Sequence, residues 1–295
     1  MRFGKAETPQ GDETVKKRKV ITLILLGVFF VGLSVLLYPS ISSYWNSKTQ
    51  SKAVVDYDTI VKSLTPQDYS AVFEKAEDYN ARLAKLNFPL SEYASVDGYN
   101  DCLNINGDGI IGYIDIDKIQ VKLPIYHGTT SSVLNSACGH IEGSSLPVAG
   151  ESTHCALSAH RGLPSAKLFS DLDRLETGDI FRITVLDKTY IYEVDQINPV
   201  LPDDVSELLI EDGKELCTLV TCTPYGINTH RLLVRGHRIE SEDLRTMQVV
   251  SEAYIIDRLI VTPIVAVPII FVLMLYVFFK PVKKKLPIND EGELI

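Results

Sequence analysis

Cysteine is scarce in this chain, and no two cysteines are spaced as C-x-x-C. That absence argues against a zinc ribbon and against a thioredoxin-type redox site. The five cysteines are Cys102, Cys138, Cys155, Cys217 and Cys222. Because five is an odd number, an exported domain would keep at least one thiol unpaired.

Positive charge is also in deficit. The chain has 29 Lys and Arg against 38 Asp and Glu, which gives a formal net charge of -9. Both ends nevertheless carry basic clusters, so the middle of the chain is acidic. An acidic surface argues against a nucleic-acid partner and suits a solvated domain that works at a cell surface. Internal repeats and low-complexity segments are absent too, which argues against a repeat architecture.

Two long apolar runs interrupt this polar composition, Val20 to Tyr38 and Leu259 to Phe279. Each is about long enough to cross a bilayer as a helix. Basic residues precede the first run and follow the second, which places both chain ends in the cytoplasm. We therefore predict a two-pass protein of the cell membrane with an extracellular middle. The alternatives are a cleaved signal peptide for the first run and a buried core helix for the second.

The predicted organisation follows from these runs. In chain order, we expect a basic cytoplasmic N-terminus (1–19), a transmembrane helix (20–40), a linker with an amphipathic helix (41–107), a β-rich domain (108–240), a connecting segment (241–258), a transmembrane helix (259–279) and a cytoplasmic tail (280–295). The amphipathic helix begins at Thr65-Pro66-Gln67-Asp68, a helix-start pattern with a capping threonine and a carboxylate three residues later. Its apolar residues then recur at helical spacing, so it must pack on the domain that follows.

From residue 110 the pattern changes to short strands separated by glycine and proline. We predict a hairpin connection at Asp187-Lys188. Many short strands with few helices indicate a closed β-barrel or a sandwich. The predicted strands are Ile110–Ile116, Val121–Ile125, His154–Ser158, Ile180–Leu186, Thr189–Gln196, Leu216–Cys222 and Arg231–Ile239.

Cys222 ends one of these strands and is flanked by Thr221 and Thr223. A core cysteine would sit among aliphatic residues, whereas a reactive one needs positive charge nearby and access to solvent. The strand stops here, because Thr223-Pro224-Tyr225-Gly226 forms a turn, so the thiol lies at a rim. The next strand begins at Arg231, whose guanidinium would favour the thiolate and donate hydrogen bonds to an oxyanion.

A thiol nucleophile also needs a proton partner, and His160 is the candidate. It lies just past the end of the strand His154–Ser158, which mirrors the position of Cys222. Together with Arg231 these residues would supply a nucleophile, an acid that protonates the leaving amine, and an anion stabiliser. The alternative interpretation is a satisfied surface histidine and a solvated strand arginine.

Three stretches resemble a known family. "TLVTCTPYGINTHRLLVRGHR" resembles the active-site strand pair of the sortases, "LSAHRGLPSAKLFSDLDRLETGD" is similar to their histidine segment, and "GHIEGSSLPVAGESTH" resembles the stretch before it. The segment "TCTPYGINTHR" and the second apolar run resemble those of class C, the pilin-polymerising sortases of Gram-positive bacteria. The similarity covers roughly residues 50 to 280. It implies a mainly β fold, an eight-stranded sortase-type barrel with N-terminal helices and two transmembrane helices.

The resemblance also implies a reaction. Cys222 would be the nucleophile, His160 the general acid/base and Arg231 the stabiliser of the substrate carbonyl or intermediate. Cys222 would cleave an LPxTG-like sorting signal between Thr and Gly and form a thioester, which a lysine amine of the next pilin subunit resolves. The partners would be LPxTG-type pilins or surface proteins. Thr221 and Thr223 become candidate substrate-binding residues.

One feature of class C is missing. These enzymes often carry an Asp-Pro-aromatic lid over the cysteine, yet no Asp-Pro pair occurs in this sequence. Asp101, Cys102 and Leu103 are the candidate lid residues in the comparable region. We hypothesise that Cys102 lies near the active site as a redox brake; the alternative is a loop cysteine without a role.

Other functions fit the residues less well. A sortase substrate would carry an LPxTG-like motif before its apolar run and basic tail, and none precedes Leu259. A housekeeping-type sortase that anchors surface proteins to the cell wall, or a cysteine hydrolase, remains the alternative to pilin polymerisation. His154, Cys155 and His160 could bind a metal only if they shared a face, which strand alternation prevents. We therefore expect no metal and no cofactor.

Overall fold

The computed structural model describes residues 10–240, 265–273 and 276. The described residues fall into two units, residues 10–40 with 265–273 and 276, and residues 41–240. Helix α1 (Gln10–Val61) contains the first apolar run, and from Val20 it is long and apolar enough to cross a membrane. Residues 265–273 of the predicted second span are helical. The other residues of that span, apart from 276, lie outside the described residues, as do the connecting segment and the tail.

The structure extends α1 through the predicted linker. Val54, Tyr57 and Val61 are buried and recur three and four residues apart, so one helix face packs on the β-rich domain. The Tyr57 hydroxyl accepts a hydrogen bond from the backbone N–H of Leu186 at 2.9 Å and donates to the carbonyl of Ile111 at 3.3 Å. Burial of this face explains why a polar stretch is helical.

Helix α2 (Pro66–Leu83) begins as predicted. The Thr65 hydroxyl accepts from the backbone N–H of Asp68, and the Asp68 carboxylate accepts from the backbone N–H of Thr65. This reciprocal capping box satisfies two helix donors. The buried face of α2 includes Phe73 and Tyr79. The remaining short helices are α3 (Pro89–Glu92), η1 (Tyr93–Ser95), η2 (Tyr99–Asp101), η3 (Asp117–Ile119), α4 (Ser131–Leu134), η4 (Leu172–Arg174) and η5 (Ser206–Leu208).

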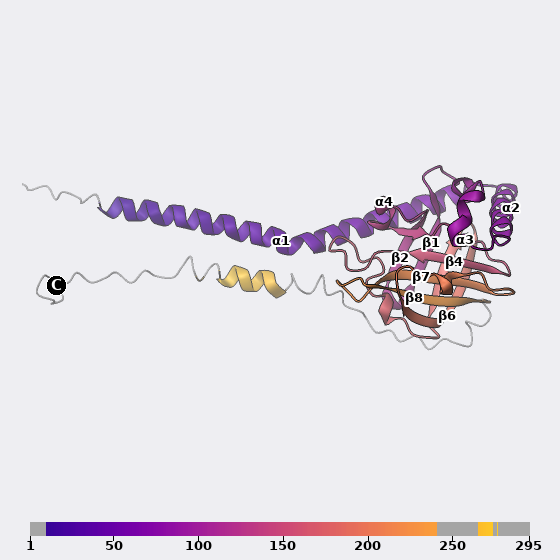
Figure 1. The fold of residues 1–295 in the computed structure, drawn as a ribbon. Coiled ribbons are helices and arrows are strands. Elements are labelled where there is room, and N and C mark those ends of the chain that lie inside the picture. The colour runs from indigo at the N-terminus through magenta and orange to yellow at the C-terminus, as the bar shows by residue number, and fades with distance from the viewer. Residues whose placement is uncertain (1–9, 241–264, 274–275, 277–295) are drawn as a thin grey trace, which may run out of the picture. The chain divides into compact units, whose positions relative to one another are not determined.

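The strands close into a barrel of eight strands in the order β1-β2-β3-β4-β7-β8-β6-β5, which confirms the predicted fold class (Figure 1). Two strand pairs, β2 with β3 and β4 with β7, are parallel, and the others are antiparallel. The strands are β1 (Ile110–Ile116), β2 (Val121–His127), β3 (Cys138–His140), β4 (Thr153–Ser158), β5 (Ile180–Val185), β6 (Lys188–Val200), β7 (Glu215–Thr223) and β8 (His230–Ile239).

The strands differ from the sequence-based prediction mainly in three places. Strand β6 continues to Val200, beyond its predicted end at Gln196. Strand β3 was not expected, because three residues are too few to show alternation. The hairpin between β5 and β6 turns at Leu186-Asp187, one residue earlier than predicted, with Val185 paired to Lys188. Leu186 adopts a positive φ of 53° there and is nevertheless buried. The sequence did not indicate a turn at this apolar residue, since turns usually carry polar residues or glycine.

The wall formed by β4, β7 and β8 has an apolar cluster on each side. Cys155, Leu157, Cys217 and Leu219 belong to the main core inside the barrel. The alternate residues Ala156, Val220 and Leu233 pack with Leu208 of η5 in a second, smaller cluster. We call this second side the outer face. Because side chains alternate along a strand, the side chain of Cys222 is on the same side as that of Val220.

A buried histidine ties the segment after η5 to the outer face. Nδ1 of His154 lies 2.8 Å from the carbonyl oxygen of Leu209, and Nε2 lies 2.7 Å from the hydroxyl of Thr218. A carbonyl only accepts, so Nδ1 donates to Leu209, and the Thr218 hydroxyl is the partner of Nε2. Burial lowers the pKa of His154 below its ordinary value of 6.5.

We expect the free energy of unfolding to fall as the pH falls below about 6.5. Burial lowers the pKa of both His154 and His127 in the folded protein. The unfolded chain therefore takes up protons first, and the stabilisation present above pH 6.5 is lost as the pH falls towards the folded pKa values. The slope is at most about 1.4 kcal/mol per pH unit for each histidine. Urea unfolding between about pH 7.5 and pH 5 measures it. The slope should be flatter in His154→Gln, and an unchanged slope in that variant would contradict the prediction.

Candidate active site

Cys222 is the most accessible cysteine of the chain. All five cysteines are free, and the other four are buried, whereas Cys222 is partly exposed. It is the penultimate residue of β7, where its backbone is paired with β8, and the pairing with β4 reaches Val220, two residues earlier. A partly exposed thiol on a rigid strand end can act as a nucleophile towards a bound carbonyl.

His160 follows β4, the parallel neighbour of β7. Ser158 is paired with Val220, and beyond the ladder the backbone N–H of Ala159 donates to the carbonyl of Val220 at 3.2 Å. The hydroxyl of Thr221 then donates to the carbonyl of Ala159 at 2.8 Å. Both strands point the same way at the same level, so the residues that come next, His160 and Cys222, lie side by side at the same edge of the barrel.

Arg231 lies directly opposite Cys222 in the antiparallel ladder of β7 and β8. Its described hydrogen bonds both use Nη1, which donates to the carbonyls of His230 at 3.2 Å and Asn228 at 3.4 Å. These bonds orient the guanidinium while its other nitrogens keep their donors for a bound group. The structure thus brings together the three residues that the sequence predicted for catalysis.

The outer face continues the site along the strands with apolar side chains. Val220 lies two residues before Cys222, and Leu233 lies two residues after Arg231. Leu90 of α3 packs against this cluster together with Val200 of β6. The sequence did not point to Leu90, because α3 is a single turn without periodicity. Val220 and Leu233 are 6% and 2% exposed, so this cluster packs Leu90 and the segment of Leu208 against the strands beside Cys222.

The two threonines beside Cys222 have other tasks than the predicted substrate contact. Thr221 is 1% exposed, and its hydroxyl is bound to Ala159, so its side chain is not available to a substrate. The hydroxyl of Thr223 lies 3.4 Å from Nη1 of Arg161. Both side chains link β7 to the segment that carries His160.

The candidate lid residues are placed against α2. Cys102 and Leu103 are each 1% exposed and belong to the main core. The thiol of Cys102 lies 3.7 Å from the carbonyl oxygen of Lys75 in α2, and the carbonyl of Asp101 accepts from the Lys75 ammonium at 3.4 Å. The structure does not bring these residues to Cys222, so it gives no support to the lid or to the redox brake.

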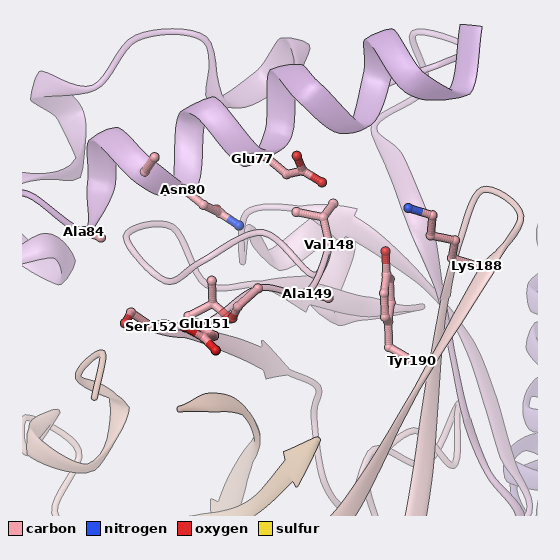
Figure 2. A pocket seen from close by; sticks show the side chains of 12 residues that line it. Glu77, Asn80, Ala84, Val148, Ala149, Glu151, Ser152, Lys188 and Tyr190 are labelled. Atoms are coloured by element: carbon pink, nitrogen blue, oxygen red, sulfur yellow. The ribbon is translucent and has the colours of Figure 1, made fainter. Parts of the chain in front are cut away.

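A separate hollow of about 470 Å³ lies between α2, the loop 148–153 and the start of β6 (Figure 2). Glu77, Lys188 and Tyr190 line it, and none of its lining residues is Cys222, His160 or Arg231. Thr153, at the beginning of β4, lines the hollow, whereas His160 follows the other end of that strand. The hollow and the catalytic edge are therefore at opposite ends of β4.

Comparison with known proteins agrees with this geometry. The profile of the sortase domain family matches residues 114–239. Sortase A of Bacillus anthracis is 26% identical over 223 residues, which are 75% of this chain and 96% of the relative. The crystal structure of sortase C1 from Streptococcus agalactiae is 50% identical with a TM-score of 0.60, and covers 64% of this chain and 98% of its own.

Sortase C of Clostridium perfringens, solved with the C-terminal cell wall sorting motif, is 41% identical with a TM-score of 0.57. It covers 64% of this chain and 99% of its own. Sortase C of Streptococcus pneumoniae, whose structure is described in terms of catalysis and pilin substrate specificity, is 41% identical over 64% of this chain and 97% of its own, with a TM-score of 0.56. The chain therefore belongs to the sortase family, and its similarity to class C structures makes it a cysteine transpeptidase of that type.

Proposed function

We propose that this chain is a membrane-anchored sortase that joins pilin subunits outside the cell, with Cys222 as the nucleophile. The observation that carries this proposal is the common edge of the barrel, with a partly exposed thiol near the end of β7, an imidazole just after β4 and a guanidinium near the start of β8. The apolar helix of α1 supports anchoring in the membrane. The sorting motif and the pilin named for the solved relatives support an LPxTG-type pilin as substrate.

The first half of the reaction forms a thioester. As the sulfur of Cys222 attacks the carbonyl carbon of the substrate threonine, His160 takes up the thiol proton, and the carbonyl oxygen becomes an oxyanion that Arg231 stabilises. The bond between Thr and Gly then breaks. His160 delivers a proton to the leaving glycine amine, and the threonine stays on the sulfur as a thioester.

The second half transfers the threonine to an amine. A lysine amine of the next pilin attacks the thioester carbonyl, and His160 takes up the proton that this amine loses. The bond between carbon and sulfur breaks, His160 passes this proton to the sulfur so that the thiol of Cys222 is restored, and an isopeptide bond joins the subunits. Thioesters react faster with amines than with water, which favours the lysine amine as the acceptor.

Intact-mass measurement of the full chain in detergent tests the first half. After incubation with an LPxTG peptide we expect an adduct equal to the peptide without its glycine end, and no adduct in Cys222→Ala. A chain that is folded but unreactive both to the peptide and to a small alkylating reagent would refute the proposal. Addition of a pilin fragment with a reactive lysine tests the second half. Pilin polymerisation requires an isopeptide-linked product, whereas release of free acid alone would indicate a hydrolase.

A further inference from the structure

Arg161, the residue after His160, is largely buried although it is charged. Its side chain is 8% exposed, and its Nη2 donates to the Asp173 carboxylate at 2.5 Å. Its Nη1 lies 3.4 Å from the Thr223 hydroxyl. The guanidinium carbon lies 5.8 Å from the ring centroid of Tyr225. Burial of a guanidinium is unfavourable unless it is paired and hydrogen-bonded, so these contacts are required for it to stay there.

Hydrogen bonds join the residues on either side of His160 to the residues on either side of Cys222. On one side of His160, the preceding carbonyl accepts the hydroxyl of Thr221. On the other side, Arg161 reaches the hydroxyl of Thr223. Thr221 and Thr223 are the two neighbours of Cys222 in β7. Each neighbour of His160 is therefore bound to one neighbour of Cys222.

The loop that follows His160 is held together by its own hydrogen bonds. The carbonyl of His160 accepts from the backbone N–H of Phe169 at 3.1 Å, and the backbone N–H of Gly162 donates to the hydroxyl of Ser170 at 3.1 Å. Asp173, in η4, holds the other end of the Arg161 guanidinium. The loop is thus a unit, and the side chain of Arg161 joins that unit to the strand of Cys222.

We propose that Arg161 is a positioning residue for the transfer reaction. Through Thr223 and Tyr225 it fixes the segment of His160 against the strand end of Cys222, and it exchanges no proton itself. The inference rests on the roles proposed above for Cys222 and His160. A displacement of about 1 Å between reacting groups can reduce a rate about 100-fold. Loss of the contacts of Arg161 should therefore lower kcat and leave the binding of the peptide nearly unchanged.

The test uses the full chain in detergent and compares Arg161→Met with Arg161→Lys. Methionine keeps much of the apolar stem but removes the guanidinium. We expect kcat in Arg161→Met to be lower by about 30- to 100-fold, with KM changed by less than about 3-fold. Lysine should restore part of the rate, since an ammonium can pair with Asp173 and lie near the ring of Tyr225, although it lacks the second arm that reaches Thr223. Active sites are counted by alkylation of Cys222, and kcat is given per titrated thiol.

Thr223→Val removes the same link from the other strand. Because the two substitutions break one contact, the double variant should be about as slow as Arg161→Met alone. Arg174→Met is the matched control. Arg174 lies in η4, in the same loop, and its guanidinium pairs with Asp171 within that loop at 3.7 Å. We expect its kcat to equal that of the unsubstituted chain.

Two results would overturn the inference. One is a normal kcat per titrated thiol in Arg161→Met, including the case of fewer titratable thiols, because Arg161 would then serve folding alone. The other is a fully additive loss in the double variant. These failures differ from failure of the proposed function, in which the unsubstituted chain would form no thioester at all.

Discussion

Replacement of Cys222 by alanine is expected to abolish thioester formation and to lower the transpeptidation rate by about 10⁴-fold or more. The loss should be this large because no other thiol can take over. The remaining four cysteines are buried, and the described contacts of Cys102, Cys138, Cys155 and Cys217 lie within the core. A peptide-release assay with the full chain measures the rate.

Cys102→Ala is the matched control for this experiment. It removes a thiol that packs under α2, so we expect normal activity, under reducing and oxidising conditions alike. Alkylation under native conditions should modify one thiol in the unsubstituted chain and in Cys102→Ala, and none in Cys222→Ala. Substantial peptide cleavage by Cys222→Ala, or native alkylation at a second cysteine, would show that the assignment of the nucleophile is incorrect.

Replacement of Arg231 by alanine is expected to lower kcat by about 10²- to 10³-fold, the usual effect of removing an oxyanion donor. Arg231 is paired with Cys222 across the ladder, and its guanidinium is oriented by the carbonyls of Asn228 and His230. Arg231→Lys should recover part of the rate, because an ammonium keeps the charge but not the planar fork of donors. Single-turnover measurement of thioester formation separates this effect from a later step.

Arg182→Ala is the control for Arg231. Arg182 also lies in a barrel strand, β5, where it pairs with Asp117 away from the catalytic edge. We expect thioester formation at the normal rate in this variant. Equal losses in Arg182→Ala and Arg231→Ala would mean that the barrel, and not the oxyanion, was disturbed.

Local sequence patterns predicted most of the fold. Alternation located β1 to the residue, and the capping threonine located the start of α2, because both signals depend on neighbours in the chain. The polar stretch before Val61 became helical for a reason outside itself, namely the burial of Tyr57 on the barrel. The three residues of β3 are a strand because β2 and β4 lie on either side. Elements that form because of tertiary contacts do not show a periodic pattern of apolar residues in the sequence.

The candidate site shows the same division. Cys222 and Arg231 could be found because a single hairpin joins their strands and its length fixes their pairing. His160 was placed by its position at a strand end and by the family resemblance. Arg161 was overlooked, because the sequence does not show that its partners Thr223 and Asp173 come from different segments. From the sequence alone, a charged residue next to a catalytic candidate is expected to be exposed to solvent, and only the structure shows that it is buried.

Because β7 is paired with β4, its register at this edge can change only in steps of one residue. Thr221 points into the barrel wall towards Ala159, and Cys222, one residue later, is on the outer face. A shift of β7 by a single residue would exchange these two side chains. The barrel could still close, but it would hide the thiol and present a hydroxyl. A shift of register in this strand therefore does not lower the activity gradually. Among insertion and deletion variants within β7, we expect proteins that are either active or inactive, with few of intermediate activity.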